Sequence, residues 1–230
     1  MKTIGLIGGM SWESTIPYYR IINEEVKNRL GGLHSAKIVL YSVEFDEIEK
    51  CQSNGEWEKS GDILGNAAKA VESAGAYFLL ICTNTMHKVV PQIASMIDIP
   101  IIHIADATAD ELEKNSTRSI GLLGTKYTMT QDFYKQRLID RGIRVLIPDE
   151  GDIETVNTVI FDELCVGKIS DVSREKLKEI ITKLKCKGAE GVILGCTEIG
   201  LLIHQSDVDI PVFDTTVIHA RKAAELAIET

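Results

Sequence analysis

Two stretches of the sequence share one pattern: Leu194–Gly200, which reads LGCTEIG, and Ile81–His87, which reads ICTNTMH. In each stretch an apolar run gives way to three successive residues that carry a hydroxyl, amide, thiol or carboxyl group. Alignment of the two stretches places Thr83 on Cys196, and the two residues that follow Thr83 fall on the two that follow Cys196. The chain therefore contains the same kind of strand end twice.

Two further blocks repeat in the same order and at nearly the same offset. Thr3–Gly8 (TIGLIG) returns as Ser119–Gly124 (SIGLLG), and Asp98–Pro100 returns as Asp209–Pro211, both reading DIP. Self-similarity of this kind is the signature of an internal duplication. It predicts two similar lobes related by a pseudo-twofold axis, with equivalent strand ends in equivalent places.

Short apolar runs alternate with amphipathic segments in both halves, for example a strand expected over Ile99–Ile104 and a helix over Thr128–Arg141. Regular alternation of strand and helix predicts an α/β protein with parallel sheets and right-handed crossovers. We expect two Rossmann- or flavodoxin-like lobes, one formed by residues 1–103 plus 214–230 and the other by residues 104–213. Ligands of such folds bind outside the carboxyl ends of the strands, so we expect an active site in the cleft between the lobes.

The composition is that of an acidic globular chain of 230 residues, 44% of them hydrophobic, with a formal net charge of −9. That charge does not attract nucleic acid or an anionic membrane, and no apolar run is long enough to span a bilayer. We therefore expect a cytoplasmic protein with neither partner. The five cysteines lack a C-x-x-C pair and the histidines lack metal-ligand spacing, so we expect reduced thiols and no metal site.

Cys196 stands where a buried strand is expected to end and a helix to begin. Backbone N–H groups and the helix dipole at such a position are expected to lower the thiol pKa and favour a reactive thiolate. A cysteine at a strand end is also commonly a small core residue without chemistry. The duplicated polar residues weigh against that interpretation, because they are costly to bury unless they face a ligand or cap a helix.

Three motifs resemble those of the cofactor-independent aspartate/glutamate racemase family, and the resemblance covers essentially the whole chain. They are Gly8–Met10 after the first strand, Thr83–Thr85 followed by His87, and Gly195–Glu198. The resemblance implies an amino-acid racemase that acts on aspartate or glutamate without a metal or pyridoxal phosphate, and it implies a homodimer. In that family two residues, ordinarily both cysteines, exchange the Cα proton on opposite faces of the substrate.

Thr83 stands at the first of those two positions, so the resemblance implies an unequal pair. Cys196 would deprotonate the L-isomer, and Thr83 could at best relay a proton to the other face. A threonine hydroxyl is a far weaker acid than a thiol and is a poor base without a strong partner. The adjacent Cys82 is not expected to replace Thr83, because neighbouring strand residues point to opposite faces.

The residues around the two positions are expected to hold the substrate. Backbone N–H groups and hydroxyls around Asn84, Thr85 and Thr197 would bind the α-carboxylate and stabilise the carbanion-like transition state. His87 would either polarise the site or bond a backbone carbonyl. Glu198 would either orient a base or bind the substrate ammonium.

Further contacts are expected from positions that correspond in the two repeats. For Ser11 and Thr128 a helix cap is an equally good explanation. The full set of expected substrate-binding residues is Met10, Ser11, Gln52, Asn84, Thr85, His87, Thr128, Thr197 and Glu198.

The choice of substrate is where the sequence departs from the family. Aspartate-specific relatives hold the side-chain carboxylate with an arginine after the second strand and a lysine before Gly167. Here Ser42–Asp46 contains no arginine, and Cys165 occupies the place of the lysine. Three residues lie close enough in sequence to replace them: Lys50, Gln52 and Lys168.

Two other functions remain open at this point. A single thiol on the same scaffold also resembles relatives that decarboxylate malonates or isomerise maleate. Alternatively, the chain binds a small carboxylate and Cys196 is inert.

Overall fold

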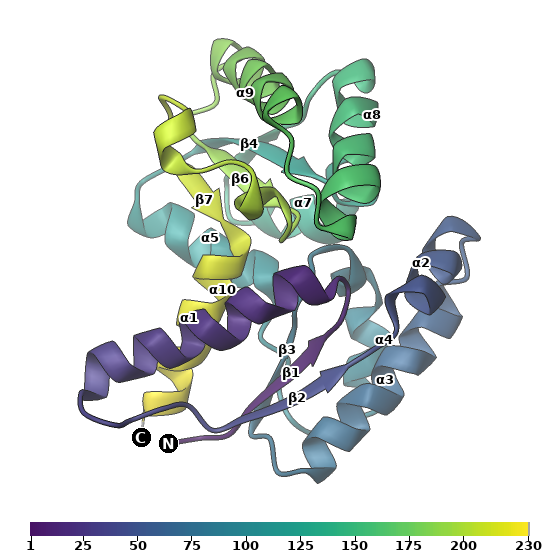
Figure 1. Cartoon of the computed structure of the whole chain (residues 1–230), viewed down its shortest axis with the longest axis vertical. Coiled ribbons are helices and arrows are strands. Elements are labelled where there is room, and N and C mark those ends of the chain that lie inside the picture. The colour runs from purple at the N-terminus through teal and green to yellow at the C-terminus, as the bar shows by residue number, and fades with distance from the viewer. Residues whose placement is uncertain (230) are drawn as a thin grey trace. The chain divides into compact units, whose positions relative to one another are not determined.

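A computed structural model describes residues 1–229 (Figure 1). The chain divides into two compact units, which are described separately. Unit 1 comprises Met1–Ile104 and the chain from His219 onward, and unit 2 comprises Ala105–Ile218. Each unit contains its own parallel sheet.

The sheet of unit 1 has three strands in the order β2-β1-β3. They are β1 (Ile4–Gly8), β2 (Ile38–Ser42) and β3 (Phe78–Ile81), and both pairings are parallel. The carboxyl end of central β1 is therefore next to the carboxyl end of β3, which delivers the first polar motif.

The fourth strand that we expect over Ile99–Ile104 is reduced to an isolated parallel bridge between Leu79 and Ile101. The prediction is wrong in extent because helix α5 (Ile104–Lys114) begins at once. The amide of Ile104 donates to the ring of His87 rather than to a strand neighbour.

Helices cover both faces of the unit 1 sheet (Figure 1). One face packs against α1 (Trp12–Leu30) and the later part of α10 (Thr215–Ile228). The other face packs against α2 (Phe45–Ser53), α3 (Trp57–Ser73) and α4 (Val90–Ala94). Strand residues alternate between the two cores, as a doubly covered parallel sheet requires.

Helix α1 forms because its apolar residues recur at helical spacing and its ends carry stop signals. Tyr18, Ile22 and Val26 are fully buried on one face, and burying a large apolar side chain contributes about 1.5–3 kcal/mol. Ser11 occupies the N-cap, and Gly31 ends the helix at a positive φ of 75°.

The sheet of unit 2 has four parallel strands in the order β5-β4-β6-β7. They are β4 (Ser119–Gly124), β5 (Arg144–Leu146), β6 (Val192–Gly195) and β7 (Val212–Asp214). The first three strands repeat the order of unit 1, and β7 takes the place of the bridge at Ile101. The predicted duplication is therefore present in the strand order.

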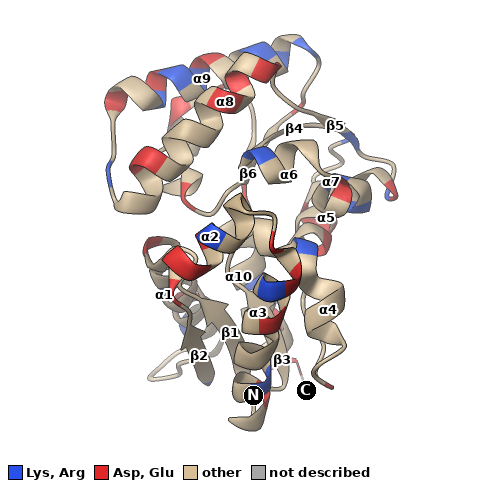
Figure 2. Cartoon of the chain, turned by 90° about the vertical axis from the view of Figure 1, so that its right-hand side faces the viewer, with Lys and Arg blue, Asp and Glu red and all other residues tan. Residues whose placement is uncertain are grey.

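One face of the unit 2 sheet packs against α8 (Glu150–Thr158) and α9 (Asp171–Cys186). A π-helical turn, η2 (Val159–Glu163), and a 3₁₀ turn, η3 (Leu164–Val166), connect the two helices toward Gly167. Figure 2 shows acidic and basic residues interspersed along α9, whereas the charged residues of α8 are all acidic.

The single helix expected over Thr128–Arg141 is two helices, α6 (Lys126–Thr130) and α7 (Asp132–Ile139). Gln131 separates them with an extended ψ of 162°. The hydroxyl of Thr130 donates to the carbonyl of Lys126 one turn earlier, a back-bond that commonly bends helices. Across residues 1–229, no helix is long and apolar enough to cross a membrane.

Candidate active site

The first polar motif follows β3 of unit 1. Cys82 continues the row of Leu80 and is buried in the core that contains α1 and α10, and burial raises the pKa of its thiol. Thr83 is also buried, and its amide donates to the carbonyl of Ile81 (2.9 Å), so the chain turns at the end of the strand. The Cys82 thiol is therefore enclosed in the core beside α1 and α10.

His87 stabilises the turn that carries Thr83 through two hydrogen bonds to the backbone. Its ring Nδ1 donates to the carbonyl of Thr83 (2.8 Å), and its Nε2 accepts from the amide of Ile104 (3.1 Å). A backbone amide only donates, so Nε2 is unprotonated and the ring is neutral in this arrangement. His87 thereby joins the end of β3 to the start of α5.

A second histidine pair supports the same region of unit 1. His219 donates through Nε2 to the carbonyl of Ile102 (2.7 Å) and accepts at Nδ1 from the hydroxyl of Tyr18 (2.9 Å). Burial lowers the pKa of His219 to about 4. The rings of His87 and His103 pack edge to face, with 4.4 Å between their centroids, so two imidazoles pack against each other beside the Thr83 turn.

The glycine turn after β1 lies beside the β3 motif because both strands end at the same edge. Gly9 has a φ of +90°, and a Cβ there would lie 2.3 Å from the carbonyl oxygen of Val43. Its amide donates to Thr15 Oγ1 (2.9 Å), and that hydroxyl donates to the carbonyl of Ser11 (2.8 Å). Met10 and Ser11 are buried in this turn.

Of the three expected replacements for the missing cations, only Gln52 is buried next to a motif. Its Nε2 lies 2.9 Å from Met86 Sδ, within the 3₁₀ turn η1 (Thr85–Val89). Lys50 is exposed and pairs with Asp46 on its own helix, and Lys168 is exposed in unit 2.

Lys88 is a cation at the same turn that the sequence reasoning did not single out. It is half-buried, and its Nζ lies 3.7 Å from the centroid of the Trp57 ring. Desolvation lowers the pKa of its ammonium group. The only indication of this cation in the sequence was that a lysine stands one turn after a threonine of the motif.

The second polar motif follows β6 of unit 2. Gly195 is required because a Cβ there would lie 2.8 Å from the carbonyl oxygen of Leu123. The next residue, Cys196, is buried, and its thiol donates to Glu198 Oε2 (2.9 Å). The hydroxyl of Thr197 donates to the same oxygen (2.9 Å), so the buried Glu198 carboxylate accepts one hydrogen bond from Cys196 and one from Thr197.

The thiol pKa of Cys196 is raised well above its usual value, so the lowered pKa that we expect from the sequence is wrong for the unliganded chain. Burial is the largest cause, followed by the charge of Glu198. The expected helix is only the three-residue 3₁₀ turn η4 (Ile199–Leu201), which brings no long-helix dipole. The resting residue is a neutral thiol held by a carboxylate.

Thr128 lies beside the polar motif of unit 2. A Cβ on Gly124 would lie 3.2 Å from Thr128 Cβ, and a Cβ on Gly195 would lie 3.6 Å from Thr128 Cγ2. Thr125, not Thr128, caps α6, since its hydroxyl oxygen accepts from the Thr128 amide (3.3 Å). The buried Thr128 therefore packs against the ends of both strands.

Asp214 is a second acidic residue near this motif that the sequence reasoning missed. It ends β7 and caps α10 by accepting from the amides of Thr216 (2.8 Å) and Val217 (3.2 Å). A Cβ on Gly200 would lie 2.3 Å from its Oδ2. Burial raises the pKa of Asp214. An aspartate before two threonines at a helix start was the available signal.

Each unit thus contains part of the expected set of residues, all of them buried. Unit 1 contains Met10, Ser11, Gln52, Thr83, Asn84, Thr85 and His87, and unit 2 contains Thr128, Cys196, Thr197 and Glu198. Within residues 1–229, no group of three His, Cys, Asp or Glu side chains is placed to hold a metal ion.

Comparison with known proteins assigns the chain to a family. Residues 7–223 match the model of the Asp/Glu/hydantoin racemases. The chain belongs to this family. The resemblance read from the three motifs and the predicted fold of two α/β lobes with parallel sheets are both confirmed.

Three members or homologues of the family illustrate the likeness. A candidate Asp/Glu racemase from Yersinia pestis is 54% identical over 100% of both chains, with a TM-score of 0.92. An aspartate racemase homologue from Pyrococcus horikoshii OT3 is 40% identical over 100% of both chains, with a TM-score of 0.85. The broad specificity amino-acid racemase RacX of Bacillus subtilis (strain 168) is 21% identical over 231 residues, 95% of each protein.

Proposed function

We propose that the protein is a cofactor-independent racemase of aspartate or glutamate, in which Cys196 and Thr83 exchange the Cα proton. The observation that carries the proposal is the 2.9 Å hydrogen bond from the Cys196 thiol to Glu198 Oε2. A buried thiol bonded to a buried carboxylate has a proton acceptor in place. Family membership supplies the reaction class, and Thr83 stands at the equivalent strand end of the duplicated unit.

The proton transfers begin on the Cys196 side. Glu198 accepts the thiol proton, and the positive ammonium group of the bound substrate favours the thiolate that results. The thiolate sulfur then takes the Cα proton of the L-isomer, and its electron pair remains on the substrate as a carbanion conjugated with the α-carboxylate. Glu198 returns its proton to solvent.

Reprotonation occurs on the opposite face of Cα. The Thr83 hydroxyl donates its proton to Cα, which gives the D-isomer, and solvent restores the hydroxyl. Removing the Cα proton of the D-isomer would need Thr83 as a base, and its high pKa makes that step slow. Exchange of the Cα proton with solvent is therefore faster from the L-isomer, although the equilibrium between the free enantiomers stays near unity.

We assign the α-carboxylate to Asn84, Thr85 and Thr197, whose amides and hydroxyls follow the two strand ends. Donors fixed around a developing negative charge are the largest single contribution in many enzymes that form such intermediates. His87 is a positioning residue, because both of its ring nitrogens bond backbone groups. Ser11 and Met10 shape the adjoining turn.

We assign the distal side-chain carboxylate to Gln52, the buried amide beside η1. A neutral amide holds a carboxylate less strongly than an arginine does, and its reach does not separate aspartate sharply from glutamate. We also propose that the enzyme is a cytoplasmic homodimer; the five free cysteines suit a reducing compartment.

The proposal is tested by Cα–H exchange in D₂O, followed by NMR with L- and D-aspartate and L- and D-glutamate. The racemase exchanges Cα of at least one acidic amino acid and produces its enantiomer. A single-thiol decarboxylase instead releases carbon dioxide from arylmalonates without exchange of amino acids. A carboxylate-binding protein binds the amino acids and exchanges neither. Either of the last two results contradicts the proposal.

A further inference from the structure

Two cysteines that are distant in the sequence share one apolar core of unit 2. Cys196, which follows β6, is a member of the buried core that the sheet forms with α8 and α9. Cys165, which lies in η3, packs against the same core. The fold therefore brings a second thiol to the region of the thiol that the proposed function uses as a base.

Electrostatics shows that the two thiols are neighbours. After burial and the charge of Glu198, a negative charge on Cys165 is the next cause of the raised pKa of Cys196, ahead of the hydrogen bond to Glu198. A Coulomb interaction weakens with separation, so an influence that exceeds a hydrogen bond needs a short distance. The shared core and this influence agree that the sulfur atoms lie close together.

Cys165 lies on a short, irregular turn. It is the middle residue of η3, which is only three residues long and runs from the π-helical turn η2 to Gly167, whose φ is 72°. Single π-helical turns occur frequently at functional sites. A disulfide requires its two Cα atoms to lie about 4.4–6.8 Å apart. A turn of three residues adjusts its backbone to that spacing more readily than a long helix does.

The two thiols differ in accessibility and in their acid–base surroundings. Cys165 is half-buried, whereas Cys196 is only 7% exposed, so a small oxidant reaches Cys165 first. Cys196 in turn has a proton acceptor in place, because its thiol donates to Glu198 Oε2 (2.9 Å). The thiolate is the form of cysteine that attacks another sulfur atom. The carboxylate therefore prepares Cys196 to attack an oxidised Cys165.

We infer that Cys165 and Cys196 form a reversible disulfide when the protein meets hydrogen peroxide, and that this modification removes the thiol base. The Cys165 sulfur attacks one oxygen of the peroxide and the O–O bond breaks. Cys165 becomes a sulfenic acid, and the second oxygen leaves as water with the proton of the Cys165 thiol.

The disulfide forms in a second step. Glu198 takes the proton of Cys196, and the Cys196 sulfur attacks the sulfur of Cys165. The S–S bond forms, the S–O bond breaks, and the hydroxyl leaves as water with the proton from Glu198. In total the two thiols lose two electrons and two protons, and one hydrogen peroxide becomes two molecules of water.

The consequence for activity rests on the proposed function, whereas the disulfide itself is measured without a substrate. A sulfur atom in a disulfide holds no proton and has no charge, so Cys196 in this state does not remove the Cα proton. Thiol–disulfide exchange with a reducing thiol restores both cysteines. Disulfides of cytosolic proteins are usually transient in this way and sense oxidants.

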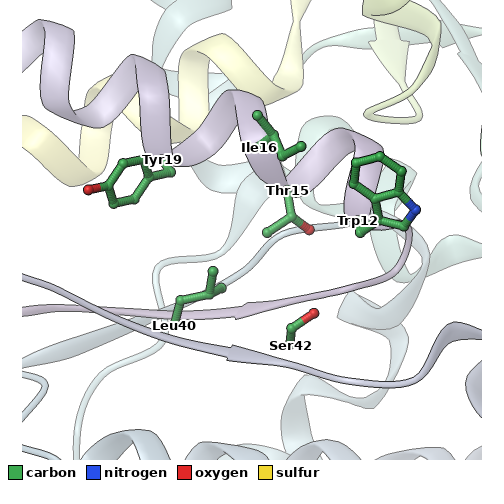
Figure 3. Close-up of a pocket in the computed structure, with 6 residues that line it drawn as sticks. All are labelled: Trp12, Thr15, Ile16, Tyr19, Leu40 and Ser42. Atoms are coloured by element: carbon green, nitrogen blue, oxygen red, sulfur yellow. The ribbon is translucent and has the colours of Figure 1, made fainter. Parts of the chain in front are cut away.

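The other three cysteines do not compete for this bond. Cys51 and Cys82 are buried in unit 1, and Cys186 is exposed at the end of α9. Figure 3 shows the groove between α1 and β2 of unit 1, and none of the six residues that line it is a cysteine. A reagent that enters this groove therefore meets no thiol there.

Oxidation of the full chain with graded amounts of hydrogen peroxide tests the inference. The remaining thiols are alkylated under denaturing conditions, and the unreduced peptides are analysed by mass spectrometry. The wild type should lose two of its five alkylatable thiols and yield peptides joined through Cys165 and Cys196. Its Cα exchange should fall at least about tenfold as the disulfide forms, and dithiothreitol should restore it.

Two variants separate the proposed pair from general oxidation. Cys165→Ser should form no disulfide, and its Cys196 thiol should remain alkylatable because the more exposed thiol is absent. Cys186→Ser is the matched control, because it removes the exposed cysteine of α9 and should form the same disulfide as the wild type.

The inference is overturned if Cys165 and Cys196 both remain alkylatable when Cys186 is already oxidised, or if either of them pairs with a different cysteine. It is also overturned by a Cys165→Ser chain whose exchange is lost and restored as in the wild type. A wild-type chain that forms the disulfide but exchanges no acidic amino acid contradicts the proposed function alone, so the two failures are distinguishable.

Discussion

The two strand ends of the duplicated scaffold differ in what holds their reactive residue. After β3, Thr83 is fixed through its backbone carbonyl by a neutral histidine, and nothing acidic is bonded to it among the described contacts. After β6, Cys196 is fixed through its side chain by the Glu198 carboxylate. At equivalent strand ends, the hydrogen bond in unit 1 therefore holds the backbone of Thr83, whereas the one in unit 2 places a proton acceptor on the Cys196 thiol.

In the proposed mechanism, that difference would allow a member of a two-base family to work with one ionisable base. Proton removal needs a base, and the Cys196–Glu198 pair supplies it. Proton delivery needs only an acid within reach, and a hydroxyl backed by solvent supplies that less efficiently. Each prediction below changes one side of the comparison.

The largest effect is expected from Cys196→Ala, which removes the base. Exchange at Cα of the L-isomer, and conversion of the L-isomer into the D-isomer, should fall about 10³-fold or more. The side chain that is lost is small, so the thermal midpoint should change little. The control is Cys82→Ala, which removes a thiol from the core beside α1 and α10 in unit 1. Residual activity within about tenfold of the wild type, roughly 1.4 kcal/mol of barrier, contradicts the role of Cys196.

Thr83→Cys should make the strand end after β3 more like the strand end after β6. A thiol at this position gives the D-face a group that ionises several pKa units below a hydroxyl. Exchange started from the D-isomer should rise by about 10²-fold, and exchange from the L-isomer should change much less. Thr83→Ser keeps the hydroxyl and should resemble the wild type. If the L-side rate alone increases, the faces have been assigned wrongly.

Glu198→Gln should separate the two roles of the carboxylate. Without the negative charge the thiol pKa of Cys196 should fall, because that charge is the second largest cause of its rise after burial. The thiolate absorbance near 240 nm should therefore appear at lower pH, and Cys196→Ala identifies the signal. The exchange rate should nevertheless drop by about tenfold, because the proton acceptor is lost.

The matched control for that variant is Glu163→Gln, which alters another carboxylate of unit 2. Glu163 accepts from the hydroxyl of Ser173 and not from Cys196. It should shift neither the thiolate titration nor the rate. A Glu198→Gln enzyme with full activity would show that the carboxylate does not accept the thiol proton.

Acid should distinguish the two units by stability. The pKa of His219 is about 4 in the folded unit 1 and 6.5 in an unfolded chain, so the unfolded state binds more protons between these values. Its contribution is present above pH 6.5 and is lost as the pH falls toward 4. Unit 2 contains only the exposed His204. We expect unit 1 to lose about 2 kcal/mol between pH 7 and pH 5.

The measurement is denaturant unfolding at both pH values with amide exchange to resolve the units. His219→Gln should reduce the loss, while His204→Gln should not. Equal acid sensitivity of the two units would contradict the role of the buried imidazole.

The sequence predicted the features that depend on repetition and alternation. Equal blocks at equal offsets implied two sheets with equivalent strand ends, and the core that contains α1 and α10 encloses Cys82. It did not predict where regular structure stops. The break at Gln131 and the shortened strand at Ile101 depend on side-chain bonds to the backbone, made by Thr130 and His87.

The chemistry of the site was harder to predict than its location. The motif located Cys196 at a strand end, but the expected thiolate assumed a helix dipole. The chain instead makes a short 3₁₀ turn that brings the carboxylate of Glu198 onto the thiol. Asp214 is distant in sequence from Gly200 and reaches it only through the pairing of β6 with β7. The exposure of Trp12, Ile16 and Tyr19 on α1 was not predicted, because these residues have the helical spacing typical of core residues.

The central claim is that one face of the substrate has an ionisable base and the other does not. The most direct test is the initial rate of Cα–H exchange in D₂O for the wild-type enzyme, started separately from the L- and the D-isomer of its better substrate under identical conditions. The account predicts that exchange from the L-isomer is at least about tenfold faster, because Cys196 acts as the base only in that direction. Equal initial rates from the two enantiomers, or a faster rate from the D-isomer, would contradict it.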